Sequence, residues 1–114
     1  MKRYLFKSDP FKQARGGYSR LLEISCAKCA RWICYYQKDG PGMLKRLYLD
    51  RILGRTRYAK LQGLSIKAVP QFVCPECRGH LGVPIIYRKE KRPAYRLFVG
   101  SVMKEIVNSG EVRW

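Results

Sequence analysis

Two Cys-x-x-Cys pairs carry the clearest chemistry in this sequence, Cys26 with Cys29 and Cys74 with Cys77. A tight turn aims both sulfurs of such a pair at one point, and two of these turns together offer four thiolates to a tetrahedral Zn²⁺ ion. The 44 residues between the pairs exceed the commonest zinc-site spacing of about 15–20 residues. We therefore predict one structural Zn²⁺ bound by all four cysteines, and an intervening segment that has a structure of its own.

Two other residues near the pairs are rival ligands. His80 follows Cys77 by three residues, but two complete cysteine pairs already fill a tetrahedral site. Cys34 is expected to pack as a small core residue. Four thiolates leave no open position for a water molecule, so the site is predicted to be structural, and we expect no enzymatic activity.

The charge of the chain is the second strong signal. Lys and Arg number 24 against eight Asp and Glu, which gives a net charge of +16. Self-repulsion on that scale destabilises a compact protein unless a polyanion relieves it. Nucleic acid is the expected partner, while an anionic membrane or an acidic protein would satisfy the same charge.

Two basic stretches are predicted to contact a phosphate backbone, where neutralisation of phosphates releases counterions and dominates affinity. Their members are Lys45, Arg46, Arg51, Arg55, Arg57 and Lys60 in the first stretch, and Arg88, Lys89, Lys91, Arg92 and Arg96 in the second. Tyrosines beside these stretches, namely Tyr48, Tyr58, Tyr87 and Tyr95, are candidates for stacking on unpaired bases. At least half of the eight tyrosines are expected in the core instead. Stacking favours RNA, in a ribosome-associated or RNA-processing role, over DNA.

The elements that position the cysteines are mostly strands. Residues 18–25 and 31–37 are predicted strands around the first pair, 71–73 leads into the second, and 81–88 with 94–99 form a hairpin with a charged tip. Residues 43–53 favour a helix, although phasing through Leu47 and Leu49 would suit a strand, and residues 102–107 favour a short helix. The predicted fold is a small α+β protein, mostly antiparallel β. It has a basic arm at 1–17 and a single domain at 18–114, with an insertion at about 38–70.

A strand, a Cys-x-x-Cys turn and a returning strand resemble the zinc-ribbon superfamily, over residues 18–37 and 71–88. The resemblance implies the fold and the metal, with Cys26, Cys29, Cys74 and Cys77 as ligands. Members are mostly modules of transcription, translation and RNA-processing proteins. Many ribbon and rubredoxin turns have Gly directly after the second cysteine, where it supplies a positive φ. Here Ala30 and Arg78 stand in those places, and Gly79 comes one residue late.

Four functions therefore compete. The leading prediction is a cytoplasmic nucleic-acid-binding zinc ribbon, because no secretory signal or membrane span is recognisable and reduced cysteines suit metal binding. A DNA-binding, transcription-related ribbon follows closely. A zinc-stabilised module that docks on a protein in a larger assembly is the third. A rubredoxin-like iron carrier is disfavoured by the high positive charge and by the missing glycines.

Overall fold

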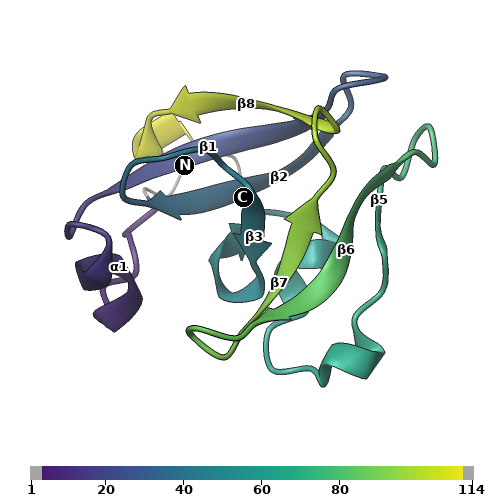
Figure 1. Cartoon of the computed structure of the whole chain (residues 1–114). Helices are drawn as coiled ribbons and strands as arrows, with labels where there is room; N and C mark the ends of the chain where they lie inside the picture. Colours follow the sequence, from purple (N-terminus) through teal and green to yellow (C-terminus); the bar gives the residue numbers. More distant parts are fainter. Residues whose placement is uncertain (1–3, 112–114) are drawn as a thin grey trace.

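The computed structural model describes residues 4–111 and consists mainly of two four-stranded antiparallel sheets (Figure 1). The first sheet has the order β4-β2-β1-β8, with bounds Ile52–Leu53, Trp32–Asp39, Ser19–Cys26 and Val102–Val107. The second has the order β3-β7-β6-β5, with bounds Arg46–Tyr48, Arg92–Leu97, His80–Tyr87 and Phe72–Val73. The prediction of a small, mostly antiparallel β fold is confirmed.

Helical structure is sparse in the described residues. The α-helix α1 (Pro10–Ala14) is five residues long. The remaining helical turns are of the 3₁₀ type, namely η1 (Leu49–Arg51), η2 (Arg57–Lys60), η3 (Ile66–Ala68) and η4 (Ser109–Glu111). None of the helices in the part of the chain described here is long or apolar enough to cross a membrane.

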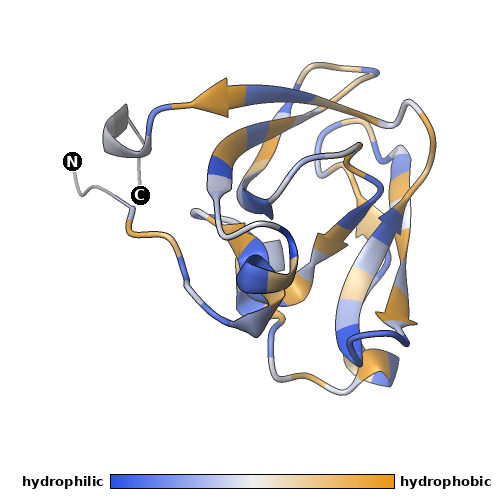
Figure 2. Ribbon diagram, turned by 60° about the vertical axis from the view of Figure 1, so that its left-hand side comes forward, coloured by the Kyte–Doolittle hydropathy of each residue, from blue (hydrophilic) through white to orange (hydrophobic). Residues whose placement is uncertain are grey.

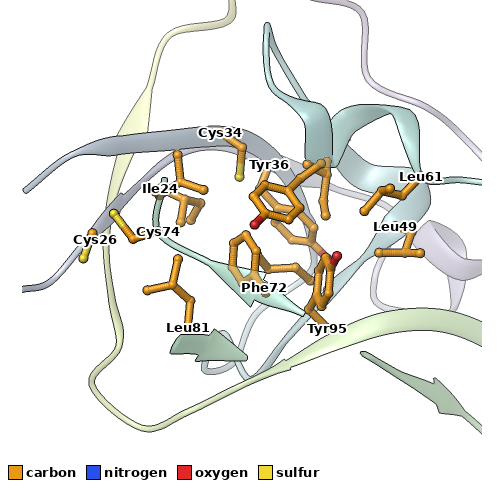
Figure 3. Close-up of a cluster of buried hydrophobic side chains, with 14 of the residues drawn as sticks. Ile24, Cys26, Cys34, Tyr36, Leu49, Leu61, Phe72, Cys74, Leu81 and Tyr95 are labelled. Atoms are coloured by element: carbon orange, nitrogen blue, oxygen red, sulfur yellow. The ribbon is translucent and has the colours of Figure 1, made fainter. Parts of the chain in front are cut away.

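The core lies between the two sheets. Apolar and polar residues alternate along several strands (Figure 2), so each sheet presents one apolar face. Side chains from both sheets point toward one another in Figure 3, with Ile24 and Tyr36 from the first sheet and Leu81 and Tyr95 from the second. Phe72 stacks on Tyr95 with ring centroids 4.8 Å apart and an angle of 17° between the planes. This packing fixes the sheets, and with them the turns that carry the cysteines.

Residues 43–53 do not form the predicted helix. They form β3, the 3₁₀ turn η1 and β4. Leu47 and Leu49 are both fully buried. Residues two apart lie on the same side of an extended chain, so this burial pattern fits a strand and not a helix. The backbone N–H of Tyr48 donates to the hydroxyl of Tyr36 over 2.9 Å, so tertiary contacts replace the hydrogen bonds that a helix would supply. The segment contributes one strand to each sheet.

The second predicted helix, 102–107, is also wrong, because these residues form strand β8. All six pair with β1 in antiparallel register. The β-branched residues of this segment suit a strand, and six residues are too few for a helix that would stand without packing. β8 is the outer strand of the first sheet (Figure 1).

The predicted strands around the cysteines and the predicted hairpin are confirmed as β1, β2, β5 and the pair β6–β7. Of the predicted basic arm, residues 1–3 lie outside the described residues. Within the remainder, the Asp9 carboxylate caps α1 by accepting from the backbone N–H of Lys12 over 3.0 Å. Asp9 also binds Arg51, so this part of the chain is attached to the body of the protein.

Candidate metal centre

The two Cys-x-x-Cys turns lie side by side at one end of the sheets, one between β1 and β2 and the other between β5 and β6 (Figure 1). The sulfur of Cys26 is 3.7 Å from that of Cys77, and the sulfur of Cys29 is 3.6 Å from that of Cys74. All four sulfurs lie within 4.8 Å of one another. Four Zn–S bonds of about 2.3 Å in a tetrahedron place sulfurs about 3.8 Å apart. The cluster therefore has the dimensions of a tetrahedral metal site.

The two turns repeat one backbone pattern. In each, the N–H of the first cysteine donates to the carbonyl oxygen five residues later, over 2.8 Å for Cys26 and 2.9 Å for Cys74. The N–H of the residue after the second cysteine donates back to the first cysteine's carbonyl, over 2.8 Å from Ala30 and 3.0 Å from Arg78. This shared pattern points both sulfurs of each pair to the same side.

The positions where many ribbon turns carry glycine keep the conformation that glycine would supply. Ala30 has φ +67° and Arg78 has φ +63°. A side chain in this left-handed region costs on the order of 1–2 kcal/mol, and the surrounding hydrogen bonds hold it there. Gly79 has a separate role, because a Cβ at that position would lie 3.3 Å from the sulfur of Cys77. A larger residue would crowd that ligand.

The sulfurs differ in environment. Cys26 and Cys74 are buried, Cys77 is half-buried and Cys29 is exposed. Burial raises the pKa of Cys26, but hydrogen bonds from the backbone N–H groups of Cys29 and Lys28 outweigh it and bring that pKa down to about 7. N–H groups aimed at a sulfur favour the thiolate, which is the form that binds a metal.

Neither rival ligand belongs to the cluster. His80 is exposed, and the group of converging metal-binding atoms contains the four cysteines without it. Cys34 is fully buried among the apolar core residues (Figure 3), and burial raises the pKa of its thiol. Its predicted role as a small core residue is confirmed.

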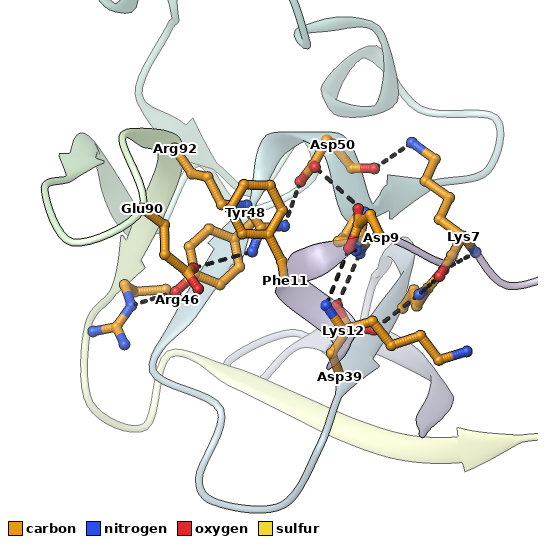
Figure 4. A network of polar contacts seen from close by, with 12 residues as sticks. Lys7, Asp9, Phe11, Lys12, Asp39, Arg46, Tyr48, Asp50, Glu90 and Arg92 are labelled. Atoms are coloured by element: carbon orange, nitrogen blue, oxygen red, sulfur yellow. Dashed lines mark hydrogen bonds and ion pairs between the residues drawn. The ribbon is translucent and has the colours of Figure 1, made fainter. Parts of the chain in front are cut away.

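Arg51 and Arg92, two of the residues predicted to contact phosphate, are instead buried in an ion-pair network (Figure 4). This network lies at the end of the sheets opposite the cysteine cluster. We call it the Arg51 network. Its members are Arg15, Arg51 and Arg92 with Asp9, Asp39, Asp50 and Glu90. Arg51 and Arg92 are only 1% and 4% exposed, so neither can reach a phosphate.

Arg51 is at the centre of this network. Its guanidinium donates two bonds of 2.7 Å to Asp9, one of 3.0 Å to Asp39 and one of 3.3 Å to Asp50. Partial burial raises the pKa of Asp9, but the hydrogen bonds from Arg51 and from the backbone N–H of Lys12, together with the positive charges of Arg51 and Arg92, hold that pKa below its ordinary value. A buried charge needs several such partners to offset its desolvation.

Arg92 and Arg15 extend the network around Tyr48. Arg92 donates to Asp50 over 2.8 Å and lies 3.8 Å from the centre of the Tyr48 ring. Arg15 binds both carboxylate oxygens of Glu90, over 2.6 and 2.8 Å. These bonds from Arg15 lower the pKa of Glu90. The network thus joins α1, η1 and the β6–β7 hairpin.

All but one of the remaining predicted contact residues are exposed, but they do not gather at one place. Lys45 and Arg96 lie beside the loop before β3, while Arg88 and Lys89 lie at the tip of the β6–β7 hairpin. The other exposed members are Arg55, Arg57, Lys60 and Lys91. Arg46 is half-buried, with its guanidinium 4.1 Å from the ring centre of Tyr87.

Base stacking by the tyrosines beside the basic stretches is wrong for three of the four. Tyr48, Tyr58 and Tyr95 are buried. The hydroxyl of Tyr95 donates to the carbonyl oxygen of Pro70, and that of Tyr58 to the carbonyl oxygen of Val73, each over 2.8 Å. Five of the eight tyrosines are buried, which confirms that at least half belong to the core.

The structure also brings together three basic residues that lie outside the two predicted basic stretches. Arg20 lies opposite Lys38 in the β1–β2 register, and both line one hollow with Lys104 of β8. Partial burial lowers the pKa of Lys38, and the positive charges of Lys104 and Arg20 lower it further. Strand pairing alone unites them, so no local pattern in the sequence indicates the cluster.

Comparisons with protein-family models, with curated proteins and with solved structures give no significant match. The function therefore has to be argued from the residues themselves.

Proposed function

We propose that this protein is a nucleic-acid-binding protein of the zinc-ribbon type, in which one structural Zn²⁺ holds a cationic scaffold in shape. RNA is the favoured polymer. The observation that carries the proposal is the uncompensated charge of the surface. Outside the Arg51 network, Arg31 is the one basic side chain of residues 4–110 that forms an ion pair with a carboxylate of the same residues, that of Glu76.

The distribution of charge explains why the surface is so basic. The Arg51 network takes four of the chain's eight carboxylates but only three of its 24 basic side chains. The rest of the chain thus carries 21 basic residues and four acidic ones. Such an excess of one sign repels itself, and a polyphosphate would relieve that repulsion.

The chemistry of the cysteine cluster supports zinc in a structural role. Four thiolates satisfy a tetrahedral Zn²⁺ and leave no position for a substrate or a catalytic water. We therefore propose no enzymatic activity for this centre. The cluster requires reduced cysteines, which fits the proposed cytoplasmic location.

The helices of the described residues do not favour the reading of duplex DNA. Its major groove admits an α-helix or a two-stranded β-ribbon. The α-helix found in residues 4–111 has five residues, and the Asp9 side chain at its start binds Arg51. Single-stranded RNA can instead lie on a basic surface with its bases unpaired.

Equilibrium binding tests the proposal. We would titrate zinc-loaded protein into labelled single-stranded RNA, single-stranded DNA and duplex DNA of mixed sequence at several salt concentrations. We expect the tightest binding to RNA and a log–log salt slope of about −0.7 for each phosphate contacted on a single strand. Absence of binding to all three polymers at low salt would contradict the proposal. Equal binding of polyglutamate would favour an acidic protein partner in a larger assembly.

A further inference from the structure

A groove runs along the inner face of β8, where the second sheet does not cover the first. One part, of about 490 Å³, is lined by Arg20, Lys38 and Lys104 over Leu22 and Ile106. The other, of about 390 Å³, lies between residues 43–46 and 96–102. The two parts share Lys104, and Gly42 of one adjoins Met43 of the other, so they lie next to each other, and we call the two together the groove.

The register of the first sheet explains why this face is open. Ile106 of β8 lies opposite Leu22 of β1, and Lys104 lies opposite Ile24. Opposed residues of antiparallel strands point to the same side of a sheet, so Lys104 and Ile106 share the side on which Leu22 and Ile24 are buried. Ile106 nevertheless remains 65% exposed. This part of the sheet face is therefore left uncovered by the described residues.

The rim of the groove is almost entirely basic. Among the described residues, Glu105 is the single carboxylate that lines either part. The six basic residues are Arg20, Lys38, Lys45, Arg46, Arg96 and Lys104.

Like charges face each other at both ends of this groove. Arg20 lies directly opposite Lys38, and Arg46 lies directly opposite Arg96. Such cross-strand pairs destabilise a sheet. A polyanion bound along the rim would remove that repulsion at both places.

Apolar side chains are exposed beside this rim. Met43, Phe98, Val99 and Ile106 are four of the nine most exposed large apolar residues in the described chain, and all four line the groove. Phe98 is 42% exposed and offers an aromatic surface to an unpaired base. A basic rim with exposed apolar side chains beside it matches a ligand with a charged backbone and flat, weakly polar groups.

We propose that this groove binds single-stranded nucleic acid, with phosphates on Arg20, Lys38 and Lys104 at one end and on Arg96 at the other, and with a base stacked on Phe98. The inference rests on the proposed function and names its site. The hairpin tip with Arg88 and Lys89 makes at most long-range electrostatic contributions.

Two double charge-reversal variants distinguish RNA binding in this groove from RNA binding elsewhere on the basic surface. Arg20→Glu with Lys104→Glu alters the groove, and Arg88→Glu with Lys89→Glu alters the hairpin tip by the same change in net charge. Affinity of zinc-loaded protein for labelled single-stranded RNA would be measured across a range of salt. We expect the groove variant to lose at least about tenfold more affinity at about 0.1 M salt, and its log–log slope to shrink by about 1.4 for two lost contacts.

A second pair of variants tests the exposed apolar side chains that line the groove. Phe98→Ala should weaken RNA binding about fivefold or more by removing a stacking surface. Leu5→Ala, at an apolar position that is 80% exposed and outside the groove, should leave binding unchanged. Zinc content and circular dichroism confirm that each variant folds, and Arg20→Gln with Lys104→Gln replaces the charge reversal if that protein does not.

The outcomes distinguish the two proposals. If wild-type protein binds RNA but the groove and tip variants lose affinity equally, the groove is wrong and the general function stands. If wild-type protein binds no nucleic acid, the proposed function itself fails. If polyglutamate displaces RNA at equal charge concentration and Phe98→Ala changes nothing, the groove accepts an acidic peptide and the inference is overturned.

Discussion

The cysteine cluster and the Arg51 network connect the same two sheets at opposite ends. At one end, Cys26 of the first sheet meets Cys77 beside the second sheet. At the other, Asp39 at the end of β2 binds Arg51, and Arg92 of β7 reaches the same group of carboxylates. The first connection would need one bound ion and two short turns, whereas the second is assembled from side chains in several separate segments. The two sheets are thus kept together by two different kinds of contact, despite the repulsion among the protein's positive charges.

The two connections also differ in what disrupts them. A chelator would remove the proposed metal ion from the first without affecting the second. The network responds to pH, because the pKa values of Asp9 and Glu90 lie below their ordinary values of 3.8 and 4.5. Their stabilisation is complete above those ordinary values and is lost as the pH falls through the lowered ones. Acid also protonates thiolates, so strong acid weakens both ends.

Replacement of Cys29 by serine should have the largest effect. A structural zinc supplies an apparent ~10–16 kcal/mol in model fingers, which matches or exceeds the ~5–15 kcal/mol stability of an ordinary domain. We expect loss of the bound metal and unfolding of much of the chain, measured by native mass spectrometry and circular dichroism. His80→Ala is the matched control and should keep one metal ion. An unchanged melting temperature in Cys29→Ser would show that the Arg51 network alone maintains the fold.

Replacement of Arg51 by alanine should have the next largest effect. It leaves the carboxylates of Asp9, Asp39 and Asp50 without their central partner, and removal of one member of a buried ion pair costs about 3–5 kcal/mol. Urea denaturation in the presence of Zn²⁺ measures this loss, and the metal should remain bound. The exposed Arg55 lies nearby in the sequence, and Arg55→Ala should change stability by less than about 0.5 kcal/mol. Equal losses in the two variants would mean that the network does not connect the sheets.

The smallest effect is expected for Arg31→Gln. Arg31 reaches Glu76 across the two cysteine turns at 3.6 Å, but the two side chains are 52% and 66% exposed. An exposed ion pair of this kind contributes about 0–1 kcal/mol. Stability should change within about 0.5 kcal/mol, and metal affinity should stay the same in a competition assay with a chelator. A tenfold loss of affinity would instead assign Arg31 to offsetting the negative charge of the metal–thiolate group.

The cluster of four cysteines was predictable from the sequence because each cysteine pair is a local motif. The Arg51 network was not, since Asp9, Arg51 and Arg92 are far apart in the chain and each looks like an ordinary surface charge. Arg51 and Arg92 were for this reason assigned to the phosphate-binding surface. The residues next to a basic residue in the sequence do not indicate that it will bind two or three carboxylates. Only the tertiary structure reveals such contacts.

The strands around the cysteines were predictable for the same local reason, while both predicted helices were wrong. In 43–53, burial of Leu47 and Leu49 selects the strand phasing. In 102–107, pairing with β1 decides the conformation. That second error also concealed the groove, because Lys104 meets Arg20 and Lys38 only when this segment is a strand.

The pairing of β1 with β8 has a consequence for how the chain is made. During synthesis β1 and β2 can pair early, but the second cysteine turn must emerge before the metal can be enclosed, and β8 follows later still. Until then one edge of β1 exposes unpaired backbone groups, which invite pairing with a neighbouring chain. A nascent chain arrested before residue 102 should therefore be prone to aggregate, and the high positive charge of this protein would help to keep such intermediates apart.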